Sequence, residues 1–118
     1  MTVKETFGRY GEDLAEASLV ALGYVIEERN WRCPQGELDI VAWDGDVLVF
    51  VEVKTRSSGA FGTAAEAVTH AKMVRLRRAA SRWLIERRPP FAATRFDVVT
   101  VTTSRTAAPV VEHLFGVS

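Results

Sequence analysis

The chain has 118 residues, with 15 basic and 15 acidic side chains and a single cysteine. This length favours one domain spanning residues 1–118, large enough for a core without disulfide staples. The zero formal net charge excludes an overall basic field that would attract nucleic acid. The lone cysteine, Cys33, excludes an intrachain disulfide and favours a reducing cytoplasm.

The expectation of a cytoplasmic location does not depend on the cysteine alone. The first residues lack the apolar core of a secretory signal peptide. The longest purely apolar run, Val47–Val51, is too short to span a bilayer. We therefore expect a cytoplasmic protein without a membrane partner.

The first expected element is an amphipathic helix from about Glu5 to Leu22, with Gly23 as its C-cap. Glu12 lies at the edge of the apolar face, whereas Asp13 and Glu16 are predicted to be solvated. Glu12 is therefore the acid of this helix that is expected to reach into the protein. The apolar face consists of Phe7, Leu14, Ala15, Ser18, Ala21 and Leu22.

Three strands are expected next, over Tyr24–Arg32, Glu37–Trp43 and Val47–Thr55. Pro34-Gln35-Gly36 turns the chain between the first two. Asp44-Gly45 predicts a tight hairpin that pairs the second and third strands antiparallel.

A loop over Arg56–Thr63 leads to a second helix, from about Ala64 to Arg87, which ends before Pro89-Pro90. A fourth strand is expected over Arg95–Thr103, and Val110–Phe115 is either a short last strand or a tail. The resulting order is α-β-β-β-α-β. Because a strand-helix-strand unit normally packs as a right-handed parallel crossover, we expect an α/β fold with both helices flanking a mixed central sheet.

The two strands of the hairpin carry acidic residues inside apolar runs. Glu52 and Lys54 lie two residues apart and share a face, and the hairpin brings Asp39 alongside Glu52. Two carboxylates about 4 Å apart repel by roughly 4 kcal/mol at an effective dielectric constant near 20. A divalent cation, an added proton or a nearby basic group would remove this repulsion.

A cation at this position is expected to be Mg²⁺, with Mn²⁺ as an alternative, because every candidate ligand is an oxygen. Such a site suits phosphodiester hydrolysis, in which Lys54 would stabilise the transition state or orient the attacking water. The alternative is a cross-strand ion pair on an exposed sheet surface, in a protein with a structural role. We favour a site because Phe50, Val51 and Val53 indicate burial on both faces.

Basic residues concentrate between Lys72 and Arg95, where eight occur with one acid. Arg75, Arg78 and Arg82 cluster on one face of the second helix and are candidates to bind a DNA backbone. A plain solvated face is an equally good interpretation of these arginines. Lys72 lies nearer the sheet and is a candidate to contact phosphate.

Two further residues, Arg56 and Asp97, stand out in the sequence. Arg56 follows the lysine strand and is a candidate to meet a nucleic-acid substrate from the loop. Asp97 opens an apolar strand, and we interpret it as a structural cap or pair rather than a catalytic residue.

As a set, Glu12, Gly36-Glu37-Leu38-Asp39 and Glu52-Val53-Lys54 resemble the PD-(D/E)xK pattern of restriction-endonuclease-like and Holliday-junction-resolvase-like nucleases. More narrowly, the chain resembles the YraN-type family of bacterial endonuclease-like proteins. Matching segments extend over nearly the whole chain: Gly8-Arg9-Tyr10-Gly11-Glu12, Gly23, Asn30-Trp31-Arg32, Gly36-Glu37-Leu38-Asp39, Val49 to Arg56, Gly62 and Phe96-Asp97.

The resemblance implies a restriction-endonuclease-like core and a role for each matching residue. Asp39, Glu52 and the Val53 carbonyl would hold the metal, with Glu12 as an auxiliary ligand and Lys54 as the catalytic lysine. The implied activity is Mg²⁺-dependent hydrolysis of DNA, in a branched or single-stranded form. The alternative is a non-catalytic nucleic-acid-binding or adaptor module that acts through a DNA-processing protein partner. Related resolvases are dimers, so a homodimer is a further option.

Overall fold

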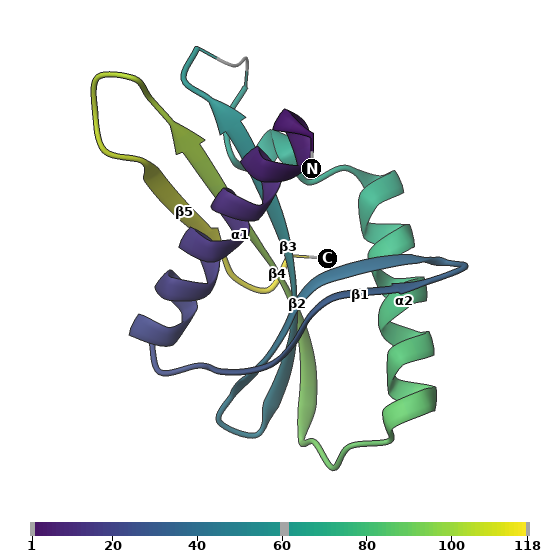
Figure 1. Cartoon of the computed structure of the whole chain (residues 1–118). Coiled ribbons are helices and arrows are strands. Elements are labelled where there is room, and N and C mark those ends of the chain that lie inside the picture. The colour runs from purple at the N-terminus through teal and green to yellow at the C-terminus, as the bar shows by residue number, and fades with distance from the viewer. Residues whose placement is uncertain (1, 60–61, 118) are drawn as a thin grey trace.

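A computed structural model describes residues 2–59 and 62–117, so Ala60 and Phe61 of the expected loop lie outside the described residues. The order α-β-β-β-α-β is confirmed, and the C-terminal segment forms a further strand (Figure 1). The elements are α1 (Val3–Ala21), β1 (Val25–Cys33), β2 (Gly36–Asp44), β3 (Val47–Ser57), the short 3-10 helix η1 (Ala65–Ala67), α2 (His70–Arg87), β4 (Ala93–Thr103) and β5 (Val110–Leu114).

The strands form one mixed sheet in the order β1-β2-β3-β4-β5. β3 and β4 are parallel and joined by the α2 crossover, whereas the other neighbouring pairs are antiparallel. The mixed sheet expected from the sequence is confirmed. Strand ends differ from the expected ones by two residues at most.

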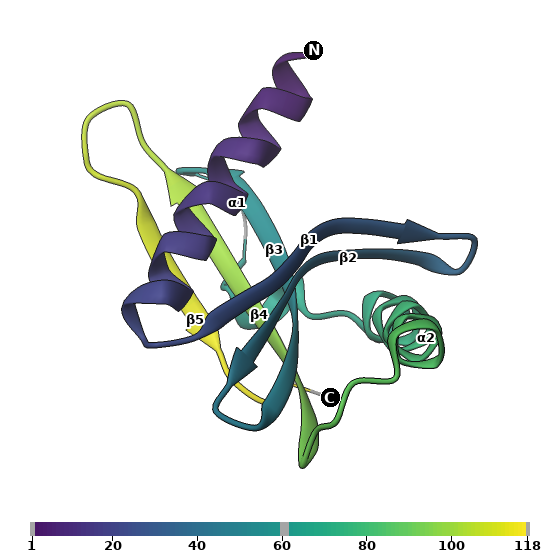
Figure 2. The same cartoon turned by 60° about the horizontal axis from the view of Figure 1, so that its bottom comes forward.

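The two helices cover opposite faces of the sheet, and each face has its own apolar core (Figure 2). On the α1 face, Leu19 packs with Ile40 and Val51 of the sheet. On the α2 face, Trp83 packs edge-on against Phe50, with ring centroids 5.8 Å apart. Successive residues of β3 therefore serve different cores, which explains why this strand is apolar on both faces.

α1 begins at Val3, two residues before the expected start, because the Thr2 side chain caps it by accepting a hydrogen bond from the Glu5 N–H at 3.1 Å. Its buried face consists of Gly11, Ala15 and Leu19. The expectation that Leu22 belongs to this face is wrong. Leu22 is 55% exposed because it is the C-cap, where the chain leaves the helix.

α2 begins at His70, and the expected start at Ala64 is wrong. Val68 and Thr69 have extended backbones that separate η1 from α2. Thr69 is the N-cap, and its hydroxyl accepts a hydrogen bond from the Lys72 N–H at 3.2 Å. The predicted end at Arg87 is confirmed, since Arg88 adopts a left-handed conformation and Pro89 follows.

Within the described residues, neither helix is long and apolar enough to cross a membrane.

Candidate functional site

The candidate site lies where β2 and β3 separate. Their ladder pairs Ile40–Asp44 with Val47–Val51 and ends there. Beyond Val51, β3 keeps only β4 as a described neighbour, while the outer half of β2 stays paired with β1. Figure 2 shows this outer half of the β1–β2 hairpin leaving the sheet towards α2.

Asp39 occupies the point of separation. The residues on either side of it, Leu38 and Ile40, pack into opposite cores, so the strand loses its simple alternation here. The Asp39 carboxylate accepts a hydrogen bond of 2.8 Å from the Val53 N–H of β3. This bond closes the gap that the ladder leaves and holds Asp39 against the segment that carries Glu52.

The pKa of Asp39 is raised to about 7. Burial is the largest cause, and the negative charges of Glu52, Glu12 and Glu37 raise it further. The hydrogen bond from Val53 acts in the opposite direction but is outweighed. Asp39 is thus a half-buried carboxyl whose pKa is raised by partial burial and by the three acids around it.

Glu52 lies on the α2 face of β3 and lines a cleft of about 500 Å³ between the β1–β2 hairpin and α2. Its pKa is raised, mainly by burial, while the positive charges of Lys72, Arg75 and Lys54 lower it. The structure therefore brings Asp39 and Glu52 into one electrostatic environment, as the sequence predicts. The two acids differ in that cations of α2 face only Glu52.

Glu12 reaches the same region from α1. Gly11 allows this approach, because a Cβ atom at this position would overlap the Thr55 side chain of β3. The Glu12 side chain is 18% exposed and lies 3.3 Å from the guanidinium of Arg29 in β1. The predicted position of Glu12, at the edge of the apolar face of α1, is confirmed.

Arg29 is a residue of this region that the sequence reading missed. Its guanidinium contacts Asp13 at 2.9 Å and Glu16 at 3.6 Å as well as Glu12. Asp13 and Glu16 are therefore partners of Arg29 and not simply solvated charges, which corrects that expectation. A signal existed in the sequence, since three acids within five residues of one helix favour a basic partner nearby.

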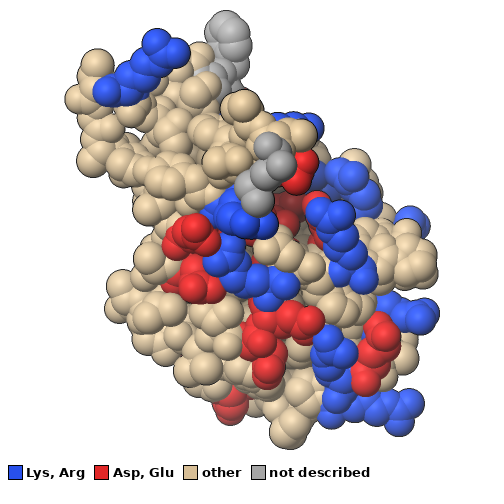
Figure 3. All heavy atoms as spheres, in the orientation of Figure 1, with Lys and Arg blue, Asp and Glu red and all other residues tan. Residues whose placement is uncertain are grey.

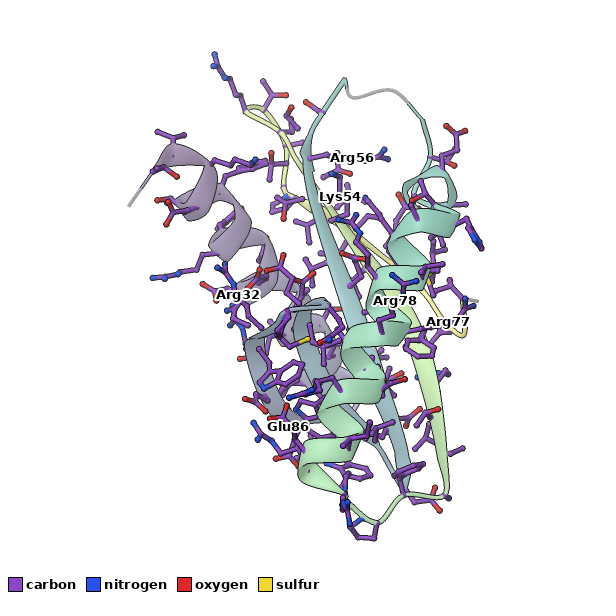
Figure 4. All side chains as sticks on the ribbon, turned by 90° about the vertical axis from the view of Figure 1, so that its right-hand side faces the viewer. Arg32, Lys54, Arg56, Arg77, Arg78 and Glu86 are labelled. Carbon is purple, nitrogen blue, oxygen red and sulfur yellow. The ribbon has the colours of Figure 1, made fainter. Side chains whose placement is uncertain are left out.

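The basic candidates divide into separate groups. Lys54 is exposed on the same face of β3 as Glu52, and Figure 4 shows it close to Arg56 along this strand. Arg56 donates hydrogen bonds to the Gly62 carbonyl at 3.0 Å and to the Thr102 hydroxyl at 3.4 Å, so its position braces the loop after β3. Lys72 lines the cleft beside Glu52.

The three arginines predicted to share one face of α2 do not all lie at one site. Arg75 lines the cleft with Lys72, whereas Arg78 and Arg82 line a second pocket further along the helix. Arg82 also pairs with Glu86 at 3.5 Å. Figure 3 shows basic side chains gathered on the α2 side of the molecule.

The carboxylate oxygens of Asp39 and Glu52, where β2 and β3 separate, are ligands of the kind that a hard divalent cation prefers. Among the residues described, Asp39 and Glu52 make no ion pair within 4.0 Å, so their charges are available to a cation. No group of three His, Cys, Asp or Glu side chains in the described ranges is arranged to hold a metal. A cation here would therefore need two carboxylates together with backbone or water oxygens.

Asp97 lies elsewhere, on the α1 face of β4, and is fully buried. Arg95 contacts it with two nitrogens at 2.9 and 3.0 Å, His113 Nε2 lies at 2.7 Å, and the Gly116 N–H donates at 2.9 Å. The interpretation of Asp97 as a structural residue is confirmed. Its partner Arg95 could have been identified, because residues two apart on a strand share a face.

The comparisons with known proteins agree with the motifs. A model of the uncharacterised protein family UPF0102 matches residues 11–101. A UPF0102 protein of Beutenbergia cavernae is 56% identical over 117 residues, covering 99% of both chains. Relatives from Frankia casuarinae and Streptomyces griseus are 50% and 51% identical, with at least 98% of each chain covered. The chain belongs to the UPF0102 family, as the resemblance to YraN-type proteins predicted.

Proposed function

We propose that this chain is a Mg²⁺-dependent endonuclease that hydrolyses phosphodiester bonds in DNA, in a branched or single-stranded form. The observation that carries the proposal is the pair of acids at the separation of β2 and β3. Asp39 is half-buried with a pKa raised to about 7, and Glu52 beside it has no ion-pair partner among the described residues. Two neighbouring half-buried carboxyls whose pKa values are both raised are typical of functional sites.

Asp39 and Glu52 would hold the cation, with the Val53 carbonyl and Glu12 as further oxygen donors. When bound, the cation would polarise the phosphoryl oxygen and help to generate the attacking hydroxide. Mn²⁺ would serve in place of Mg²⁺, since both prefer oxygen ligands. Glu12 can turn to the site without leaving Arg29 unpaired, because Arg29 retains Asp13 and Glu16.

Lys54 would act on the reacting phosphate. It lies on the same face as Glu52 and is exposed, so a phosphodiester can reach its ammonium group. A cation at this position stabilises the negative charge that develops in the transition state. Asp39 must lose its proton to bind a metal, so metal binding should strengthen as the pH rises through about 7.

The test is a cleavage panel with linear, flapped, single-stranded and junction DNA in Mg²⁺ or Mn²⁺. We expect metal-dependent cleavage by the native chain and its loss, by at least a hundredfold, in Asp39→Asn and Lys54→Ala. Asp46→Asn, which changes an exposed acid of the tight hairpin turn, is the matched control and should cleave normally. The absence of cleavage in the whole panel would contradict the proposal.

One observation favours a second candidate, a binding or adaptor module without catalysis. The described residues include no set of three side chains arranged to hold a metal. A binding module should bind DNA with a steep salt dependence, lose binding when Arg75 and Arg78 are replaced, and be indifferent to Asp39→Asn. Melting curves with and without Mg²⁺ separate the two candidates, since a bound metal raises the melting temperature.

A further inference from the structure

The cleft beside Glu52 has two walls of different origin. One wall is the tip of the β1–β2 hairpin, which contributes Arg32 to Glu37, and the other is α2, which contributes Lys72, Arg75 and Leu76. Glu52 enters between them from β3. Glu52 thus lies in a cleft that has a hairpin on one side and a helix on the other.

The hairpin tip is packed against α2. Gly36 has a φ of 151° and comes so close that a Cβ atom would lie 3.5 Å from the Arg75 carbonyl oxygen and 3.9 Å from the Ala79 methyl group. Leu38, just beyond the tip, is buried with Leu76 and Ala79 in the same core. This packing fixes the width of the cleft, because opening it would expose apolar surface.

The charges in the cleft favour a polyanion. Lys72 and Arg75 line the cleft beside Glu52 and make no ion pair within 4.0 Å among the described residues. Arg32 lies at the rim and pairs loosely with Glu37 at 3.3 Å, with both side chains largely exposed. These two basic side chains, which lie beside Glu52 in the cleft, are suited to bind the phosphates on either side of a phosphate that reacts at Glu52.

A second pocket of about 350 Å³ continues the basic surface on the other side of the hairpin tip. Gln35 lines both pockets, so the tip lies between them. Figure 4 shows Arg77 and Arg78 on α2, with Arg32 on the hairpin. We call the basic residues along this helix the α2 track, which consists of Lys72, Arg75, Arg77, Arg78 and Arg82.

We propose that the α2 track binds one unpaired nucleic-acid strand and that the cleft excludes a duplex. The track spans about 15 Å from Lys72 to Arg82 at 1.5 Å per residue, which is long enough for several phosphates. A cleft of about 500 Å³ is of the size that encloses a small ligand. A base-paired duplex carries its second strand and stacked neighbours with it, so we expect a single strand to fit this cleft beside the hairpin tip better than a duplex does.

The lining residues also indicate how the strand is read. Among the residues that the structure describes, no aromatic side chain lines either pocket, so the described part of the track offers bases no stacking platform. The contacts are therefore mainly with the backbone, and the track should bind strands with little sequence preference. For single strands, the logarithm of the binding constant falls with the logarithm of salt by about 0.7 per neutralised phosphate. Four or five contacts give a slope of about −3.

Binding can be tested without metal, by fluorescence anisotropy in EDTA. The probes are labelled oligo(dT), oligo(U), a blunt duplex and a fork with one unpaired arm. We expect oligo(dT) and the fork to bind at least tenfold more tightly than the duplex, with a salt slope of about −3. Equal or tighter binding of the blunt duplex would overturn the inference. The affinities for oligo(U) and oligo(dT) show whether the track prefers RNA or DNA, which offer the same phosphate chemistry.

Two double variants remove charge from the two halves of the track: Lys72→Ala/Arg75→Ala and Arg78→Ala/Arg82→Ala. Each should weaken single-strand binding at least tenfold and reduce the salt slope by about 1.4. Lys4→Ala/Arg105→Ala is the matched control, because it removes the same charge from α1 and from the β4–β5 loop. Equal weakening by the control would show that only net charge matters and would overturn the inference.

The inference depends on the proposed function for one point only, which is that the bound strand is cleaved at Glu52. Single-strand binding without cleavage in Mg²⁺ would sustain the inference and contradict the nuclease. Metal-dependent cleavage of branched DNA, with a preference for the blunt duplex in EDTA, would sustain the nuclease and contradict the inference.

Discussion

Asp39 and Asp97 lie on β2 and β4 of the same sheet, and burial raises the pKa of both carboxyls. Asp97 receives hydrogen bonds from Arg95, His113 and the Gly116 N–H, which outweigh burial and lower its pKa to about 2. Asp39 accepts one hydrogen bond, from the Val53 N–H, and the charges of Glu52, Glu12 and Glu37 add to the effect of burial, so its pKa rises to about 7.

The difference shows which aspartate the fold has compensated. Around Asp97, the chain supplies enough donors to make a buried charge part of the structure. Around Asp39, the described residues assemble three acids and supply one hydrogen-bond donor, the Val53 N–H, but no ion pair within 4.0 Å. A carboxyl that the chain does not compensate is the one available to an external cation, and this is why we assign the function to Asp39.

Replacing Asp97 should have the largest effect on stability. Asp97→Asn removes the charge that pairs with Arg95 and His113, and it leaves their buried nitrogens without an anion. Breaking a buried pair in this way costs about 3–5 kcal/mol, and we expect the lower end because Arg95 keeps Asp44 at 3.0 Å. Urea unfolding at pH 7 measures the loss. Asp46→Asn is the exposed control, and an equal loss in both would show that the network is not stabilising.

Asp39→Asn should have a smaller effect of the opposite sign. The native state binds the Asp39 proton more tightly than the unfolded state does, so ionisation of this carboxyl costs stability as the pH rises from about 4 to about 7. At pH 8 the amide avoids this cost while still accepting the Val53 hydrogen bond, and we expect a gain on the order of 2 kcal/mol.

The pH profile sharpens this second prediction. Asp97 acts in the other direction, because its lowered pKa stabilises the native state above pH 4 and this contribution is lost as the pH falls towards 2. Unfolding free energies of the native chain and Asp39→Asn should therefore agree near pH 4 and diverge up to pH 8. Parallel profiles over this range would show that Asp39 titrates normally.

Regular geometry made part of the site predictable. The Asp44-Gly45 turn fixes the register of β2 and β3, and alternation places Glu52 and Lys54 on one face. Arg29 escaped prediction because the register of β1 shifts between Ile26 and Glu28. Ile26 consequently packs on the α1 side while Glu28 bonds to Trp83 on the α2 side, although simple alternation would place both on one face.

Long-range pairings were the other unpredictable part. His113 meets Asp97 only because β5 pairs with β4 in a register that places His113 opposite Val99. The sequence left Val110–Phe115 as a strand or a tail, so this contact had no basis before the sheet was known. The division of the α2 arginines likewise depends on where the hairpin tip rests, which no local pattern specifies.

The smallest expected effect concerns Tyr24. This residue precedes β1 and links it to the cluster of Arg95, Asp97 and His113. Its hydroxyl accepts a hydrogen bond from Arg95, while its ring is buried in the α1-side core. Tyr24→Phe keeps the ring and removes this one bond, so we expect a loss of about 1 kcal/mol in urea unfolding. Arg95 keeps both contacts with Asp97, so the acid-induced loss of stability below pH 4 should persist. If Tyr24→Phe abolished that acid transition, the tyrosine and not the arginine would be what compensates Asp97, and the contrast with Asp39 would need another cause.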